Sequence, residues 1–290
     1  MVFMSRAFFN YRFIIICTAI LCLWHFYTGR QQSYYSKLQY NVKHTPSIFA
    51  TVVRQTAVPS DVIKRLKNTW LKRVDSYQFF SPFAASNDSF RLPGGKFSQR
   101  YGPLYSWLSH WIVSMEVTNV FSFFIYTFDD AYVIVNNLRK DLATIDSEIP
   151  TYSLLGNCSS AISPTIVLSR AAVKALASGR PINSNFDGFS SLTDCLADNQ
   201  ATNLCTCFDK FGLKKINLET DYEGKLRYFK MDRHFSRQEI SLTKQKHGYY
   251  WDGKEAFNNL SSNIIAFLNV NPLEQTILDT LIYRLNKHEL

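Results

Sequence analysis

The chain has 290 residues, 46% of them hydrophobic, and a formal net charge of +9. The apolar content is enough for a folded core in one large domain or two small ones. The cations are spread along the chain and form no dense block, which argues against nucleic acid as a partner. A solvated surface and attraction for an anionic ligand such as a nucleotide diphosphate both remain compatible with this charge.

The first element along the chain is an apolar run, FIIICTAILCLWHFYT, that contains no Asp, Glu, Lys or Arg. A charge-free run of this kind near the amino terminus is typical of a membrane anchor or a cleaved signal peptide. We favour a signal anchor at residues 13–29, because bulky residues such as Trp24 and Tyr27 stand where a signal peptidase needs small ones. Residues 1–12 would then form a cytosolic tail.

The anchor predicts a type II protein whose carboxyl-terminal part lies in the lumen of the Golgi or the endoplasmic reticulum. Residues 30–46 are polar and rich in tyrosine, which is typical of a stem, and residues 47–290 are the predicted lumenal domain. The lumenal prediction agrees with three Asn-x-Ser sequons, which begin at Asn87, Asn157 and Asn259.

Within the predicted domain, short apolar runs alternate with segments of helical periodicity. Strands are expected at 48–53, 77–80, 121–127, 152–155 and 264–268, and residues 166–169 lead into a helix. Helices are expected at 60–70, 101–117, 132–142, 170–176 and from Pro272, the last capped by Asn271 and with Ile277, Leu278, Leu281, Ile282 and Leu285 on one side. Alternating strands and helices predict an α/β domain with a mostly parallel sheet.

The six cysteines divide between the predicted anchor and the predicted domain. Cys17 and Cys22 lie in the anchor, so four remain for the lumen: Cys158, Cys195, Cys205 and Cys207. Four cysteines in an oxidising compartment permit two disulfides, with three possible connectivities. Metal binding is disfavoured, because Cys205-Thr-Cys207 lacks the two-residue gap of a zinc knuckle and no second pair exists.

Two acids, Asp129 and Asp130, directly follow the predicted strand at 121–127. Carboxylates at the carboxyl end of a strand in an α/β sheet can hold Mg²⁺ or Mn²⁺, which in turn binds a diphosphate. The alternative is a simple turn in which an aspartate caps the following helix. We therefore take Asp129 and Asp130 as candidate metal and nucleotide ligands.

The segment FDDAYVIVNNLRKDL at 128–142 resembles the part of the core 1 β1,3-galactosyltransferase family that carries an Asp-Asp-Asp motif, then Thr-Tyr-Val and Glu-Asn-Leu-Arg. The resemblance continues in the segments at 68–73, 167–171 and 264–285. It implies a GT-A-like domain that uses Mn²⁺ to transfer galactose from UDP-galactose to GalNAc on glycoproteins. The family also contains an inactive relative, the endoplasmic-reticulum chaperone that folds the active transferase.

The departures from this family fall on positions that carry its chemistry. The first Asp of its motif falls on Phe128, a late metal-ligating His on Leu268, and an acidic pair on Gln200 and Ala201. A glycine-rich run falls on 162–165, which includes Pro164. Losing a general base typically lowers a rate by about 10²–10⁴-fold.

Other residues could supply the missing groups. Asp194 and Asp198 lie close to the lost acid and are weak candidates for the catalytic base. His234 and His247 could replace the lost metal ligand, although ordinary surface histidines are the favoured interpretation for both.

The favoured hypothesis is a catalytically impaired, chaperone-like helper of a galactosyltransferase in mucin-type O-glycan synthesis. The main alternative is an active, divergent β1,3-galactosyltransferase that uses UDP-galactose and Mn²⁺, and a third is a lectin-like module that binds glycans. The several missing catalytic groups favour the helper.

Overall fold

The computed structural model describes residues 45–54, 60–83, 89–92, 101–156, 158, 165–180, 182, 192, 195, 203–230 and 260–285. The chain divides into two units, Met1–Lys43 and His44–Leu290, and every described residue belongs to the second. No helix in these ranges is long and apolar enough to cross a membrane. The predicted anchor at 13–29 lies outside them.

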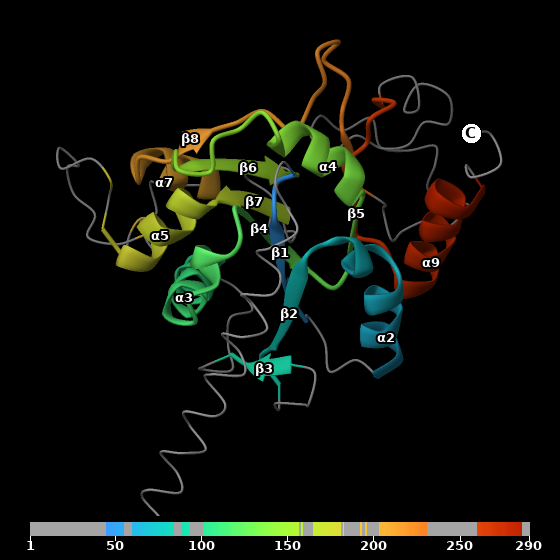
Figure 1. Ribbon diagram of the computed structural model, residues 1–290, viewed down its shortest axis with the longest axis horizontal. Helices are drawn as coiled ribbons and strands as arrows, with labels where there is room; N and C mark the ends of the chain where they lie inside the picture. Colours follow the sequence, from blue (N-terminus) through green and yellow to red (C-terminus); the bar gives the residue numbers. More distant parts are fainter. Residues whose placement is uncertain are drawn as a thin grey trace, which may run out of the picture. The chain divides into compact units, whose positions relative to one another are not determined.

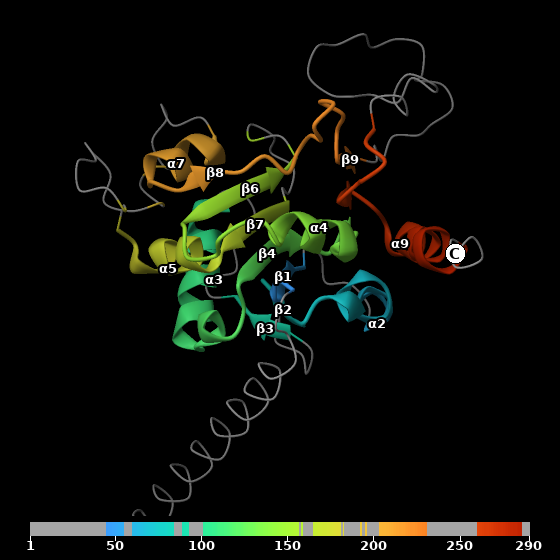
Figure 2. The same ribbon diagram turned by 45° about the horizontal axis from the view of Figure 1, so that its top comes forward.

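A seven-stranded sheet forms the centre of the described residues, in the order β3-β2-β1-β4-β7-β6-β8 (Figures 1 and 2). Its strands are β1 Ile48–Val53, β2 Ser76–Ser81, β3 Ser89–Arg91, β4 Phe123–Phe128, β6 Thr151–Leu155, β7 Thr165–Ser169 and β8 Lys214–Lys215. The strands predicted at 48–53, 77–80, 121–127 and 152–155 are all confirmed, while residues 166–169, expected only to lead into a helix, are part of β7.

The sheet is mixed but mostly parallel, as the sequence predicted: four of its six strand pairings are parallel and two are antiparallel. β3, β2, β1 and β4 are parallel, but β7 is antiparallel to both of its neighbours, β4 and β6. β6 ends at Leu155 and β7 begins at Thr165. This connection is too short for the helical crossover that parallel neighbours need, so the chain reverses.

A second sheet within the described residues has the order β5-β10-β9, with β5 Ala131–Val133, β9 Tyr228–Lys230 and β10 Ala266–Leu268. The prediction of a helix from residue 132 was therefore wrong at its start, because Ala131–Val133 pairs with β10 and α4 covers only Val135–Leu142. Aromatic and β-branched residues fit a pleated strand well, and here the pairing with β10 determines the conformation.

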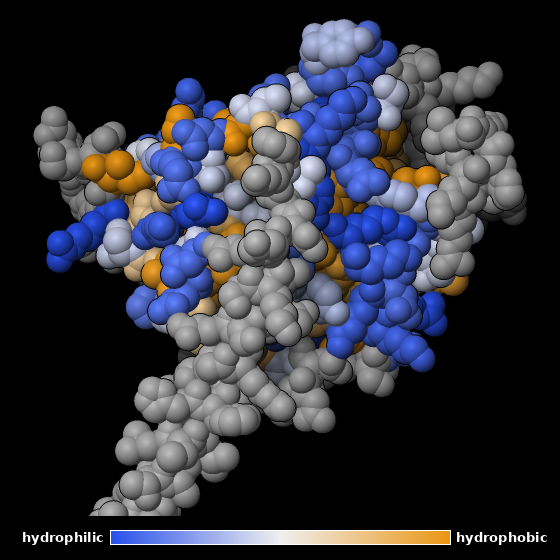
Figure 3. All heavy atoms as spheres, viewed as in Figure 1, coloured by the Kyte–Doolittle hydropathy of each residue, from blue (hydrophilic) through white to orange (hydrophobic). Residues whose placement is uncertain are grey.

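Helices cover both faces of the main sheet. α3 Tyr101–Ser114 and α5 Arg170–Ser178 pack together on one face, while α2 Ser60–Asn68, the 3₁₀ helix Trp70–Arg73 and α4 share a buried core with the other (Figures 1 and 2). Polar side chains gather over α2 on the face that Figure 3 shows. α7 Leu204–Lys210 lies beside β8.

The last helix, α9 Pro272–Thr280, continues into a π-helical turn, Leu281–Leu285. The predicted cap is confirmed: Asn271 and Glu274 form a capping box. However, the two buried residues of α9 are Gln275 and Asp279, at 0% and 2% exposure. The large apolar residues Leu273, Ile277 and Leu281 are at least half exposed. The predicted apolar side is therefore only partly buried: Leu278 and Ile282 pack against the core, while Ile277 and Leu281 are half exposed.

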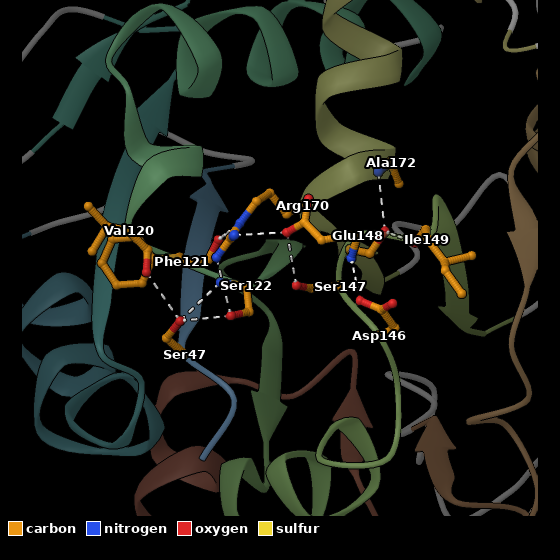
Figure 4. Close-up of polar contacts among 11 residues, drawn as sticks. Ser47, Val120, Phe121, Ser122, Asp146, Ser147, Glu148, Ile149, Arg170 and Ala172 are labelled. Carbon is orange, nitrogen blue, oxygen red and sulfur yellow. Dashed lines mark hydrogen bonds and ion pairs between the residues drawn. The ribbon is translucent and has the colours of Figure 1, made fainter. Parts of the chain in front are cut away.

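At the amino ends of β1 and β4, short polar side chains bond the main chain (Figure 4). The Ser122 N–H donates to Ser47 Oγ at 3.0 Å, and the Ser47 hydroxyl donates to the Val120 carbonyl at 3.3 Å. Arg170 donates from Nε to the Phe121 carbonyl at 3.1 Å and pairs with Glu148 at 2.8 Å. We call these six residues the amino-edge network.

Candidate functional site at the carboxyl edge of the sheet

The acid pair lies where the strand order of the main sheet reverses. The chain runs from β1 outward to β2 and β3 and then returns to β4 on the other side of β1. Asp129 directly follows β4, and Arg54 directly follows β1. The last residues of the two strands, Phe128 of β4 and Val53 of β1, are paired in register. Open α/β sheets bind ligands outside the carboxyl ends of their strands at such a reversal.

Three segments hold the main chain of the acid pair. The Asp129 N–H donates to the Val53 carbonyl at 3.1 Å, which ties the pair to β1. The Val270 N–H donates to the Asp130 carbonyl at 2.7 Å, and Gln275 Nε2 donates to the Asp129 carbonyl at 3.0 Å. Asp129 is 8% exposed and Asp130 is partly buried. The turn that carries the carboxylates is thus fixed by the sheet and by α9.

The described residues place few possible metal ligands beside this pair. Among them, no group of three or more His, Cys, Asp or Glu side chains is placed to hold a metal. The neighbouring positions are apolar: Phe128 is 7% exposed, and Leu268 is 5% exposed and pairs with Ala131. Oxygen ligands suit Mg²⁺ and Mn²⁺, so Asp129 and Asp130 have the right chemistry but supply few ligands.

The position of Leu268 also bears on the family resemblance. The resemblance aligned Leu268 with a metal-ligating histidine of the family, 138 positions after Asp130 in the sequence. In the structure Leu268 lies opposite Ala131, the residue that follows Asp130. The two aligned positions, Asp130 and Leu268, are thus distant in the sequence but lie near each other in the fold.

A buried polar cluster holds the segment that follows the acid pair. The Tyr132 hydroxyl donates to Asp279 Oδ1 at 3.1 Å, and Arg73 and Lys72 form ion pairs with the same carboxylate. The Arg73 guanidinium lies 3.4 Å from the centre of the Tyr283 ring. The cluster joins the 3₁₀ helix, β5, α9 and the π-helical turn.

Charge explains the protonation of this cluster. Burial opposes the ionisation of Asp279, but the hydrogen bond and charge of Arg73, with the charge of Lys72, bring its pKa below the usual value. Burial and the negative charge of Asp279 raise the pKa of Tyr132. Asp279 is therefore a carboxylate and Tyr132 a neutral donor at neutral pH.

The Asn-Leu-Arg part of the family-like segment makes structural contacts. Asn137 Nδ2 donates to the Ile264 carbonyl at 2.7 Å. Arg139 pairs with Asp75 at 2.8 Å and also donates to the carbonyls of Pro46 and Arg73. These side chains attach α4 to its surroundings and do not reach the acid pair.

The four predicted lumenal cysteines form two disulfides, Cys158–Cys205 and Cys195–Cys207, with Cα–Cα distances of 5.6 Å and 5.8 Å. The prediction of two disulfides is confirmed, and the structure selects one of the three connectivities. Cys158 lies three positions after Leu155, the last residue of β6.

Several predicted site residues lie outside the described residues. They are the candidate bases Asp194 and Asp198, the histidines His234 and His247, and the sequon residues Asn87, Asn157 and Asn259. Of the glycine-rich run, only Thr165 is described. It is 1% exposed in β7, with its hydroxyl 2.7 Å from that of Thr127.

Sequence reasoning missed the two polar residues of α9 that contact the acid-pair segment, Gln275 and Asp279. Both stand on a helix whose apolar residues suggested ordinary packing. The available signal was their spacing of four, which puts both on one face of a helix together.

Comparisons with known proteins give distant matches, and no protein-family model matches the chain. A Caenorhabditis elegans protein described as uncharacterized protein F37A4.3 is 25% identical over 244 residues, which cover 82% of this chain and 78% of the relative. A solved glycosyltransferase involved in the glycosylation of the major capsid of PBCV-1 matches 82% of this chain and 100% of its own at 12% identity, with a TM-score of 0.40. At that score the likeness carries no weight for function.

Proposed function

We propose that this protein is a catalytically impaired relative of the core 1 β1,3-galactosyltransferases that acts as a chaperone-like helper of a galactosyltransferase in mucin-type O-glycan synthesis. One observation carries the proposal. The acid pair is present at the strand-order reversal, while Phe128 and Leu268 beside it are apolar at two positions where the family resemblance expects a metal ligand or catalytic acid.

The chemistry of sugar transfer explains why these positions matter. A sugar nucleotide loses a nucleotide diphosphate, and a bound Mn²⁺ would neutralise that leaving group, held here by Asp129 and Asp130. Two carboxylates leave most of the coordination sphere to water and phosphate, and no histidine orients the ion from Leu268. The apolar ring of Phe128 adds no ligand.

The arrangement of the family-like segments supports the resemblance. Residues 68–73, 128–142 and 264–285 are far apart in the sequence, yet Arg73, Tyr132 and Asp279 meet in the buried cluster. Contact between these three segments is expected if they belong to one fold inherited from a common ancestor. A GT-A-like domain is the fold that the resemblance implies for the mixed α/β sheet described above.

An active transferase is the second candidate, and the placement of the acid pair favours it. The pair, and Arg54 beside it, lie where α/β sheets bind ligands. A cation that follows β1 opposite the acid pair would suit a metal-bound diphosphate. Asp194 and Asp198 remain the candidates for a base in this case.

Location and partners follow from the same proposal. An anchor at 13–29 would place the domain in the lumen of the Golgi or endoplasmic reticulum, where sequons at Asn87, Asn157 and Asn259 could carry glycans. Two disulfides support an oxidising compartment. The proposed partner is a galactosyltransferase client.

Depletion and rescue in the cells of origin separate the two candidates. Loss of the protein is expected to lower core 1 glycans and the amount of folded partner transferase. Re-expression of the wild type and of Asp130→Asn should then restore both equally, because a helper needs no metal ligand. Asp61→Asn, on the exposed surface of α2, is the matched control. Rescue by Asp61→Asn together with failure of an equally abundant Asp130→Asn would favour the enzyme instead.

A further inference from the structure

The attachment of α9 to the acid-pair segment is polar. Gln275 and Asp279 are one helical turn apart and fully buried. Gln275 Nε2 donates to the Asp129 carbonyl at 3.0 Å, and Asp279 accepts from the Tyr132 hydroxyl at 3.1 Å. One helix therefore holds both ends of the segment that starts with the acid pair.

The start of α9 fixes two consecutive carbonyls. The Asp129 carbonyl accepts from Gln275, and the Asp130 carbonyl accepts from the Val270 N–H at 2.7 Å. Val270 directly precedes Asn271, whose capping box sets the position of the first turn of the helix. The orientation of the peptide unit between the two aspartates, and hence of their carboxylates, depends on how α9 begins.

Gln275 is an unusual choice for this position if packing alone matters. Its Nε2 also lies 3.4 Å from the Val270 carbonyl, and its Oε1 has no hydrogen-bond partner among the described residues. A buried acceptor without a partner is costly, and an apolar side chain of similar length would avoid that cost. Such a side chain would, however, lack the N–H group that donates to the Asp129 carbonyl.

We propose that Gln275 is a positioning residue for the acid pair: its amide holds the Asp129 carbonyl, so that the two carboxylates face one ligand. The consequence for metal binding rests on the second candidate under the proposed function, an active transferase that uses Mn²⁺ and a nucleotide diphosphate at this pair. The consequence for the backbone does not depend on that assignment.

The test uses the full-length protein and the variant Gln275→Met, which keeps the length of the side chain and removes the donor. Gln78→Met is the matched control, because Gln78 is a partly buried glutamine on β2 whose Nε2 donates to the Phe79 carbonyl at 3.1 Å. Amide hydrogen exchange is measured at Asp129, Val270 and Phe124, and Mn²⁺ binding is measured with UDP present.

Gln275→Met is expected to accelerate exchange about tenfold at Asp129 and Val270, as expected for the loss of one hydrogen bond. Exchange at Phe124, near the amino end of β4, should stay unchanged. Mn²⁺ affinity should fall about fivefold to tenfold, because the carboxylates no longer share one orientation. Gln78→Met should change neither quantity.

Three results have different meanings. Unchanged exchange at Asp129 and Val270, or an equal increase at Phe124, would overturn the positioning role. Wild-type affinity for Mn²⁺ in Gln275→Met would overturn it as well. A wild-type protein that binds no Mn²⁺ with UDP would count against the active-transferase candidate, and the exchange measurement alone would then decide the role of Gln275.

Discussion

The two edges of the main sheet are built in different ways. At the amino edge, Ser47 and Arg170 of the amino-edge network bond main-chain groups that lie 75 and 49 positions away in the sequence. At the carboxyl edge, the main chain of Asp129 and Asp130 is bonded by α9, and Gln275 is 146 positions away from Asp129 in the sequence. Both edges use contacts that are distant in the sequence. Those of the first edge fix main-chain groups ahead of β1 and β4, while those of the second span a longer stretch of chain and hold the turn that carries two carboxylates.

The comparison predicts that the carboxyl edge is the more sensitive to losing distant links. Replacing Cys158 and Cys205 by serine should lower the free energy of unfolding by about 4 kcal/mol, because the bridge closes a loop with a sequence separation of 47. The same change at Cys195 and Cys207, with a separation of 12, should cost about 3 kcal/mol. Denaturant unfolding measures both, and a smaller loss for the longer loop would contradict the account.

Removing the charge at the centre of the buried cluster should have the next largest effect. Asp279→Ala leaves Arg73 and Lys72 without their partner and should cost about 3 kcal/mol in denaturant unfolding. Asp279→Asn keeps the shape of the side chain and removes the charge, so it separates packing from electrostatics. A loss below about 1 kcal/mol in both variants would show that the cluster does not hold the carboxyl edge.

The same carboxylate gives a stability that depends on pH. The pKa of Asp279 is lower in the folded protein than its usual value of 3.8. Its contribution is therefore fully present above that value and is lost as the pH falls through the lowered pKa, because the unfolded chain takes up the proton first. Unfolding of the wild type and of Asp279→Asn, compared between pH 7 and pH 3, should show a smaller acid loss in the variant.

Some of this architecture follows from local sequence, and some does not. The apolar runs of β1 and β4 and the Asn271 cap are local signals, and each was predicted correctly. The strand at Ala131–Val133 was mistaken for helix because its partner, β10, lies far along the chain. Gln275 was missed for the same reason: its partner, Asp129, is distant, and only the folded chain shows which face of α9 is buried.

The smallest effect is expected at the amino edge. Arg170→Ala removes one bond to a main-chain carbonyl and one partly exposed ion pair, and should cost about 1 kcal/mol. Glu148→Ala removes only the exposed partner and should stay within about 0.5 kcal/mol. Neither variant should change Mn²⁺ affinity, and a change in either would mean that the two edges are coupled.

The central claim is that the carboxyl edge keeps an acid pair without the groups that sugar transfer needs. Galactose transfer from UDP-galactose to a GalNAc-bearing glycopeptide, measured with Mn²⁺ on the purified full-length protein and on Asp130→Asn, tests it most directly. We predict that the wild type shows no turnover above that of the variant. Mn²⁺-dependent turnover by the wild type that Asp130→Asn abolishes would contradict the claim and establish the protein as an enzyme.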